Sequence, residues 1–307
     1  MGTQNLPAAA RFRGIYPMMY AFFARDGSLD REAMHKQAQT CVRGGAHGVA
    51  ALGLGSEIGK LLPAERRQFV QWLAQDVAGA VPLAVTVSEA TVDAQVEFAA
   101  WAQSEGASWL ILQPPPERGM PEQWYADFFA AVMQRVKLPC AIQNAPEYTG
   151  VGLGPGAVKA LQVQCPNFAL LKGEGPALAI RRVIEEVRGG LAVFNGRGGL
   201  ELLDNLRAGC AGMIPATDTF DYQVRIFELV QRATLNEERA AQALYEKILP
   251  AIVFALQSLD TLICYGKRIA ALRLGLGEVH DRAPALTPTR FGIDCVRRYA
   301  EMLGPLV

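Results

Sequence analysis

Short apolar runs alternate with longer amphipathic segments along the chain as far as Phe220. A short apolar run is typical of a strand buried in a parallel sheet, and an amphipathic segment is typical of a helix that covers the sheet. The apolar runs cover residues 14–20, 48–52, 81–87, 108–112, 139–142, 168–172, 191–194 and 211–214. Helical segments lie between them at residues 30–43, 63–78, 91–105, 121–136, 177–188 and 199–208. This pattern predicts the α/β class, with a (β/α)8 TIM barrel as its architecture.

The strand pattern stops after Phe220, and helical periodicity then continues almost to the end of the chain. The segment 275–288 interrupts it and is predicted to be a loop. We therefore expect a catalytic barrel over residues 10–233 and a C-terminal helical region over residues 234–307. No linker rich in glycine, serine or proline separates the two, so the helical region is expected to pack on the barrel.

Composition excludes several classes of function. The 307 residues include 30 basic and 30 acidic side chains without a basic block, so nucleic acid is not an expected partner. The longest apolar stretches, such as 248–256, are shorter than the ~20 residues that span a bilayer, and no membrane contact is expected. Residues 1–10 lack the features of a secretory signal, which predicts a cytoplasmic protein.

Six cysteines without a Cys-x-x-Cys pair are predicted to be reduced core residues, and three widely separated histidines indicate no metal site.

Lys172 is the strongest candidate for chemistry because it ends the run 168–171 and precedes a Gly-Glu-Gly-Pro segment. It is thus expected where a buried strand opens into a loop. An apolar surrounding disfavours a charged amine, and a neutral amine attacks ketones to form Schiff bases. A strand-end lysine also commonly keeps its stem buried and its ammonium in water. The neighbouring residues favour covalent catalysis.

Glu174 lies two residues beyond Lys172, and alternate residues of a strand point to the same face. Both side chains are therefore expected in one cavity. Glu174 either shuttles protons beside the amine or holds the amine in its charged form, and the sequence leaves both roles open.

Other strand ends supply candidate substrate-binding residues. Gly55 and Ser56 lie in a turn whose backbone N–H groups suit a carboxylate, although such turns also form for purely structural reasons. The fifth strand leads into Gln143 and Asn144, whose amides orient hydroxyls or satisfy nearby backbone groups. The seventh leads to Asn195 and Arg197, and Arg197 is either a carboxylate ligand or a surface arginine.

These residues lie within motifs that resemble the dihydrodipicolinate synthase and N-acetylneuraminate lyase family of Schiff-base enzymes. The likeness extends over most of the chain and includes the 53–57 turn, Asn144-x-Pro146, Leu171-Lys172 and the Asp-Arg-Ala-Pro segment at 281–284. It implies that Lys172 forms the Schiff base with a small-molecule 2-oxo acid and that Gly55 and Ser56 hold the carboxylate of this substrate. It also implies a homo-oligomer, either a tetramer or a dimer, and no cofactor.

Departures from the family pattern narrow the expected reaction. The tyrosine that usually relays protons on the fifth strand is Gln143 here, and a glutamine carries no proton. The arginine that the synthases have after the nearby proline is Tyr148. These differences argue against synthase activity and weaken the case for simple aldol cleavage.

One branch, the L-2-keto-3-deoxyarabonate dehydratases, resembles this chain in a Ser-Glu turn, a Gln-x-Ala-Pro strand and a Lys-x-Glu strand. The resemblance implies a lyase, most consistent with a dehydratase of a 2-oxo-3-deoxy sugar acid, with Lys172 as the nucleophile and Glu174 as the proton carrier. Three alternatives stay open: an aldolase that releases pyruvate, a dihydrodipicolinate synthase-like protein, and a non-catalytic barrel that binds a sugar acid.

Overall fold

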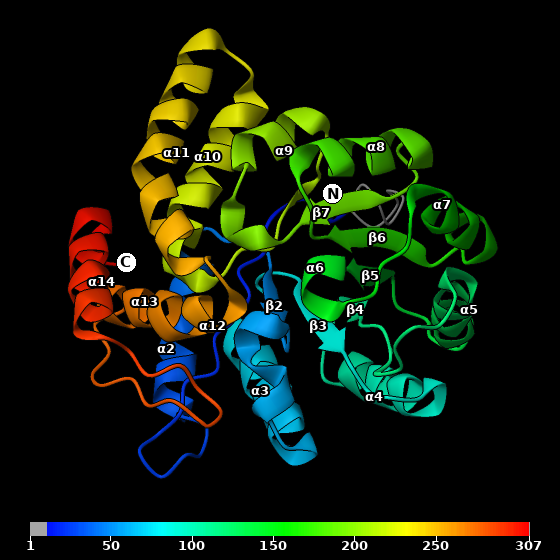
Figure 1. The fold of residues 1–307 in the computed structure, drawn as a ribbon, viewed down its shortest axis with the longest axis horizontal. Helices are drawn as coiled ribbons and strands as arrows, with labels where there is room; N and C mark the ends of the chain where they lie inside the picture. Colours follow the sequence, from blue (N-terminus) through cyan, green and yellow to red (C-terminus); the bar gives the residue numbers. More distant parts are fainter. Residues whose placement is uncertain (1–10, 307) are drawn as a thin grey trace. The chain divides into compact units, whose positions relative to one another are not determined.

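The computed structural model describes residues 11–306. Eight parallel strands form a nearly closed barrel in the order β1-β8-β7-β6-β5-β4-β3-β2 (Figure 1). The strands are β1 Gly14–Ile15, β2 Val49–Ala51, β3 Leu83–Val87, β4 Trp109–Leu112, β5 Cys140–Asn144, β6 Phe168–Gly173, β7 Ala192–Asn195 and β8 Gly212–Met213. Each predicted apolar run overlaps one of these strands, and the predicted TIM barrel is confirmed.

Two features of the predictions lie outside the described residues. Residue 10, where the barrel domain was expected to begin, is one of them. The segment 1–10, in which no secretory signal was found, is the other.

The strands are apolar without alternation because both of their faces are covered. All five residues of β3 and all six of β6 are buried. In a parallel sheet one face packs on the surrounding helices and the other fills the barrel, so continuous apolar runs are the expected pattern.

The chain forms two compact units. The first consists of residues 11–14, Ala84–Arg197 and Glu201–Ile214. In this unit α4, α5, α7 and α8 lie outside the strands (Figure 1). Its helices are α4 Val92–Ser104, α5 Glu122–Met133, α6 Pro146–Thr149, α7 Pro155–Gln164, α8 Ala177–Val187 and α9 Leu202–Ala208.

Helices α6 and α7 lie between the fifth and sixth strands, where the sequence pattern does not locate a helix. Both begin with a proline at their first position, Pro146 and Pro155. Proline suits the first turn because its missing N–H has no partner there in any helix. The prolines and glycines of this segment were therefore helix starts and caps as well as loop residues.

Aromatic rings fill the interior of the first unit. Trp109 of β4 lies between Phe12 and Phe194, with ring centroids 6.0 Å and 5.8 Å away. All three rings are almost completely buried. Phe194 pairs in register with Lys172 of β6, so this aromatic cluster borders the predicted catalytic lysine.

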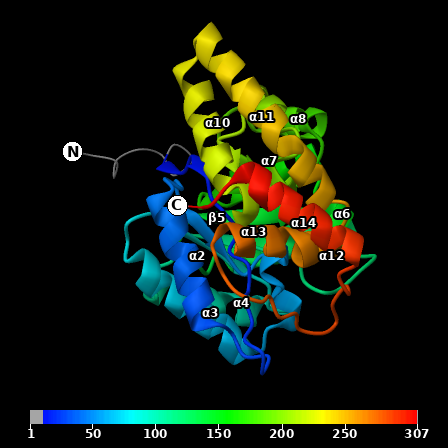
Figure 2. The ribbon, with the colours of Figure 1, turned by 90° about the vertical axis from the view of Figure 1, so that its left-hand side faces the viewer.

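The second unit consists of Ile15–Leu83, Gly198–Leu200 and residues 215–306. Figure 2 shows α13 and α14 side by side. The predicted loop 275–288 connects them in the sequence. The elements of this unit are α2 Arg31–Arg43, η2 Leu54–Ser56, η3 Ile58–Lys60, α3 Pro63–Val77, η5 Thr217–Thr219, α10 Phe220–Arg232, α11 Leu235–Ala255, α12 Leu259–Thr261, η6 Leu262–Gly266, α13 Lys267–Arg273 and α14 Arg290–Leu303. A further short turn, η4 Arg197–Gly199, follows β7.

C-terminal helices pack against N-terminal residues of the same unit. Lys267 of α13 donates from Nζ to the carbonyl of Ala21 at 3.3 Å and lies over the ring of Phe23. The expectation that the C-terminal region packs on the barrel stays a prediction. The proposed boundary between residues 233 and 234 stays a prediction.

All six cysteines are buried and unpaired, as predicted for reduced core residues. Within residues 11–306, no single helix has the length and hydropathy needed to cross a membrane. One bent pair, Leu235–Ala255 with Leu259–Arg273, passes that test by length and composition when the two are taken together, and the pair is bent by 108°.

Asp218 is a buried acid in the second unit. It lies in η5, is 4% exposed, and accepts a hydrogen bond from the Tyr20 hydroxyl at 3.1 Å. Burial raises the pKa of Asp218 to about 6 because the surrounding protein penalises the carboxylate. In the unfolded chain the ordinary aspartate pKa of about 3.9 applies.

We predict that Asp218 makes the protein less stable as pH rises from about 4 to about 7. The folded protein binds the proton more tightly than the unfolded chain. The stabilisation from Asp218 is therefore fully present below the pKa of the unfolded state and is lost as pH rises through the pKa of the folded state. A difference of about two pKa units corresponds to roughly 3 kcal/mol. In urea unfolding, the stability of Asp218→Asn relative to wild type should rise by about this amount between pH 4 and pH 8. A difference that is independent of pH would contradict the assignment.

Candidate active site

Strand β6 brings Lys172 and Glu174 together in the first unit. Lys172 lies on the strand, and Glu174 is the first residue beyond its end at Gly173. The Nζ of Lys172 is 2.8 Å from Oε1 of Glu174, and the two residues are 5% and 7% exposed. The predicted juxtaposition is thus present, as the two-residue period of an extended chain requires.

The backbone beyond β6 stays extended because Glu174 continues the ladder with the neighbouring strand. The Glu174 N–H donates to the carbonyl of Asn144 at 2.9 Å. Within the sheet, Lys172 pairs in register with Gln143 on one side and with Phe194 on the other. The amine therefore has an amide on one flank and an aromatic ring on the other.

A chain of side-chain amides holds the Glu174 carboxylate. Gln143 donates from Nε2 to Oε1 of Glu174 at 2.8 Å and accepts at Oε1 from Nε2 of Gln113, also at 2.8 Å. All three residues are less than a tenth exposed. Because Gln113 supplies a donor, Gln143 must turn its oxygen toward Gln113 and its amino group toward Glu174. The carboxylate oxygen that faces Lys172 thus accepts two hydrogen bonds.

The sequence analysis missed Gln113. It directly follows β4, at the same ends of the parallel strands as Gln143 and Lys172, and this position was a signal that it could reach the site. Its own backbone carbonyl accepts a hydrogen bond from Nε2 of Gln95 at 3.1 Å. Gln113 is therefore anchored by its main chain and its side chain.

Gly196 allows the loop after β7 to approach the carboxylate. A Cβ at this position would lie 2.7 Å from the carboxyl carbon of Glu174. That distance is shorter than any side chain tolerates, so glycine is needed for the closeness of loop and acid.

Asn144 and Asn195 stabilise loops in the structure. Asn144 donates to the carbonyl of Leu153 at 2.8 Å and accepts from its N–H at 2.7 Å, which closes the loop containing α6. Asn195 donates to the carbonyl of Gly175 and to Oδ1 of Asn205, both at 2.9 Å. Their predicted contacts with substrate stay predictions, and the observed contacts give both residues a supporting role.

Arg197 faces α6 from the end of β7. Its guanidinium lies 3.9 Å from Glu147 and 3.4 Å from Glu201, and its side chain is 19% exposed. Tyr148, the neighbour of Glu147 on α6, lies near enough to Arg197 for the guanidinium to oppose the rise in the pKa of its phenol. The predicted surface role of Arg197 therefore does not describe it, because it joins two loops of the first unit.

Gly55 and Ser56 belong to the second unit and lie in η2. The Ser56 hydroxyl is buried and donates to the carbonyl of Met19 at 2.6 Å. Its single proton is therefore used by the main chain. Glu57 follows in a left-handed conformation, with φ of 57°.

Glu57 is held by two lysines, of which Lys267 is a second candidate for a reactive amine. Lys60 lies 2.7 Å from Oε2 of Glu57, and Lys267 is paired with Oε1. Burial lowers the pKa of Lys267, and Glu57 opposes this effect. Lys267 has no exposed surface and is enclosed by Glu57, the Ala21 carbonyl and the Phe23 ring, so a ketone has no access to it.

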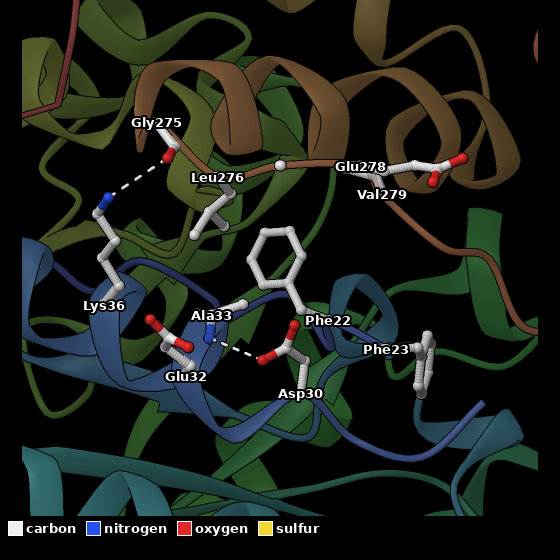
Figure 3. Close-up of a pocket in the computed structure, with 11 residues that line it drawn as sticks. Phe22, Phe23, Asp30, Glu32, Ala33, Lys36, Gly275, Leu276, Glu278 and Val279 are labelled. Atoms are coloured by element: carbon white, nitrogen blue, oxygen red, sulfur yellow. Dashed lines mark hydrogen bonds between the residues drawn. The ribbon is translucent and has the colours of Figure 1, made fainter. Parts of the chain in front are cut away.

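A cavity of about 250 Å³ lies in the second unit between α2 and the segment 275–279 (Figure 3). Its charged residues serve local structure. Asp30 caps α2 by accepting from the Ala33 N–H at 3.0 Å, and Lys36 donates to the Gly275 carbonyl at 3.4 Å. None of the predicted site residues lines this cavity.

Among residues 11–306, no three side chains of the kinds that bind metals converge on one point.

Comparisons with known proteins identify the family. The model of the dihydrodipicolinate synthetase family matches residues 11–288. The chain belongs to this family. Its members are lyases, and the predicted resemblance is confirmed.

Curated relatives within the family carry different activities in their names. The probable 2-dehydro-3-deoxy-D-pentonate aldolase YjhH of Escherichia coli K12 is 29% identical over 240 residues, which are 74% of this chain and 79% of the relative. The L-2-keto-3-deoxyarabonate dehydratase of Azospirillum brasilense is 28% identical over 209 residues, covering 66% and 67%. A 4-hydroxy-tetrahydrodipicolinate synthase of Haloarcula marismortui is 27% identical over 278 residues, covering 90% and 89%.

Solved structures of dihydrodipicolinate synthetase family members share the fold. A putative dihydrodipicolinate synthetase from Pseudomonas aeruginosa has a TM-score of 0.85 at 24% identity, covering 95% of this chain and 99% of that one. YagE from Escherichia coli K12, solved in complex with pyruvate, has a TM-score of 0.87 at 22% identity, covering 95% and 98%.

We predict that Gln113→Leu destabilises this family member by about 1–3 kcal/mol, since it leaves the buried oxygen of Gln143 without a donor. Urea unfolding measures the loss. Gln103→Leu, on the exposed side of α4, is the matched control and should change stability by no more than about 0.5 kcal/mol.

Adding Gln143→Leu tests whether the two amides act as a pair. The substitution should cost less in the Gln113→Leu background than in the wild type, because the orphaned oxygen is removed. Additive losses would show that the two amides do not interact.

Proposed function

We propose that this chain is a Schiff-base lyase that dehydrates a 2-oxo-3-deoxy sugar acid, with 2-keto-3-deoxyarabonate as the model substrate. The observation that carries the proposal is the carboxylate of Glu174, 2.8 Å from the Lys172 amine and hydrogen-bonded by Gln143. Glutamine replaces the tyrosine that serves as proton carrier elsewhere in the family, and Glu174 provides a carrier in its place. The dehydratase from Azospirillum brasilense supports this type of reaction.

Schiff-base formation begins with proton transfer from the Lys172 ammonium to Glu174. The neutral amine then attacks C2 of the substrate, and a proton passes from the attacking nitrogen to the C2 oxygen, which becomes a hydroxyl. Glu174 returns its proton to this hydroxyl, which leaves as water while the C2=N bond forms. The product is a protonated imine, and Glu174 is again a carboxylate.

Dehydration follows from the same imine. Glu174 removes a proton from C3, and the electron pair of the C3–H bond forms the C2=C3 bond of an enamine. The enamine then re-forms the C2=N bond, creates a C3=C4 bond and expels the C4 hydroxyl. Hydrolysis of the conjugated imine releases the dehydrated oxo acid and regenerates Lys172.

Substrate binding is proposed from the family resemblance and the local contacts. The turn with Gly55 and Ser56 is assigned to the substrate carboxylate. The Ser56 hydroxyl donates to Met19, and the Ser56 N–H donates to the Gly53 carbonyl at 3.0 Å, so the N–H of Gly55 is the donor expected to bind the carboxylate. Arg197 is assigned to the polar end of the sugar acid.

Aldol cleavage is the second candidate, because the relative YjhH is named as a probable aldolase of a 2-dehydro-3-deoxy pentonate. It uses the same Schiff base and breaks the C3–C4 bond. The two reactions differ in product: cleavage releases pyruvate, whereas dehydration retains every carbon. A panel of 2-oxo-3-deoxy sugar acids, followed by NMR for both products, distinguishes them.

We predict that pyruvate and borohydride label Lys172 irreversibly, since reduction converts the C2=N bond into a stable amine. Peptide mass spectrometry locates the adduct. Lys172→Ala should abolish labelling and turnover, whereas the exposed control Lys137→Ala should preserve both. An adduct on Lys60 or Lys267 would place the site elsewhere.

We predict that Glu174→Gln slows water loss about 10²–10⁴-fold, the usual contribution of a positioned proton carrier. The borohydride adduct on Lys172 should still form when labelling is allowed to run to completion. Glu185→Gln, on the exposed side of α8, is the control. Turnover at the wild-type rate in Glu174→Gln would remove this residue from proton transfer.

A further inference from the structure

Loss of the C4 hydroxyl needs a second proton carrier, and this step rests on the proposed dehydration. Hydroxide is a poor leaving group, so an acid must protonate it as the C4–O bond breaks. Glu174 is committed to the proton on C3, and C4 lies one carbon farther from the lysine. The acid is therefore expected beyond Glu174, in the loops that follow the strands.

Tyr148 occupies such a loop, on the short helix α6 that follows β5. This helix is fixed at both ends. Its backbone turn begins with the Tyr148 N–H donating to the Ala145 carbonyl at 2.9 Å, and the double hydrogen bond between Asn144 and Leu153 closes the loop. The phenol is thus held by a rigid segment and is half-buried.

The surroundings of Tyr148 link it to the catalytic pair. Its hydroxyl lies near enough to Arg197 and Glu174 for both charged groups to act on it electrostatically. Arg197 is itself fixed between Glu147 and Glu201. Glu201 is further anchored because its carboxylate accepts from the N–H of Ala177, the first residue of α8, at 3.2 Å.

Protonation favours Tyr148 as an acid rather than a base. Burial raises the pKa of Tyr148, Glu174 adds to this effect, and Arg197 opposes it. The phenol is therefore protonated at neutral pH. The two carboxylates near Arg197, Glu147 and Glu201, are both ion-paired with its guanidinium.

We infer that Tyr148 is the catalytic acid that protonates the departing C4 hydroxyl. As the C4–O bond breaks, its electron pair takes the phenolic proton and water leaves, while the enamine electrons form the C3=C4 bond. The resulting phenolate is stabilised by the Arg197 guanidinium. Glu174, which holds the proton from C3, returns that proton to the phenolate directly or through water, so both residues are reset.

Tyr148→Phe separates this step from Schiff-base chemistry. Exchange of the C3 protons of pyruvate in D2O requires Lys172 and Glu174 but no leaving group. We expect the variant to keep this exchange within about twofold of wild type and to lose water from the sugar acid about 10²–10⁴-fold more slowly. The matched control is Tyr299→Phe, which makes the same change on α14, far from Tyr148 in the sequence.

A substrate analogue with fluorine in place of the C4 hydroxyl tests the role of the acid, because fluoride departs without protonation. Tyr148→Phe should release fluoride at close to the wild-type rate. An equal loss on both substrates would show that Tyr148 only positions the sugar acid, and unchanged dehydration would also overturn the inference. A wild-type enzyme that exchanges pyruvate protons but cleaves C3–C4 would instead refute the proposed dehydration, and Tyr148 as its acid with it.

Discussion

The buried ion pair between Lys172 and Glu174 is the interaction on which the site depends. Removing two charges from water is costly, and their mutual attraction offsets that cost only when further hydrogen bonds satisfy them. The amide chain from Gln113 through Gln143 provides such a bond at the carboxylate. Gly196 provides the space that lets the loop after β7 close over it.

This arrangement accounts for the absence of a tyrosine on β5. Gln143 carries no proton, but its two-sided amide gives the neighbouring acid a fixed orientation. In the mechanism proposed above, the protons are carried by this carboxylate beyond the next strand.

Periodicity in the sequence is sufficient to predict much of the fold and the pairing of Lys172 with Glu174. Apolar runs located all eight strands, and the two-residue period placed Lys172 beside Glu174. The same period implies that Gln143 and Asn144 cannot both face the site, because they are adjacent on the strand and their side chains point in opposite directions. Only Gln143 reaches the carboxylate, and Asn144 closes a loop.

Contacts between distant segments were beyond the reach of the sequence pattern. Gln113 is 30 residues from its partner Gln143, and no local signal indicates which amide it meets. In the sequence, Tyr148 is notable only because it replaces the arginine of the synthases. Its proximity to Arg197 depends on the short helix α6, which the sequence pattern does not locate. The sequence suggests Ser56 as a donor to the substrate, whereas in the structure its hydroxyl donates to the carbonyl of Met19.

A crystal structure of the borohydride-reduced pyruvate adduct tests whether Lys172 is the nucleophile and Glu174 the proton carrier. We predict a single bond from Lys172 Nζ to C2, with the Glu174 carboxylate still hydrogen-bonded to Gln143 and in contact with C3. These roles would be contradicted by an adduct in which Glu174 has turned away from C3, or by a bond from C2 to any other lysine.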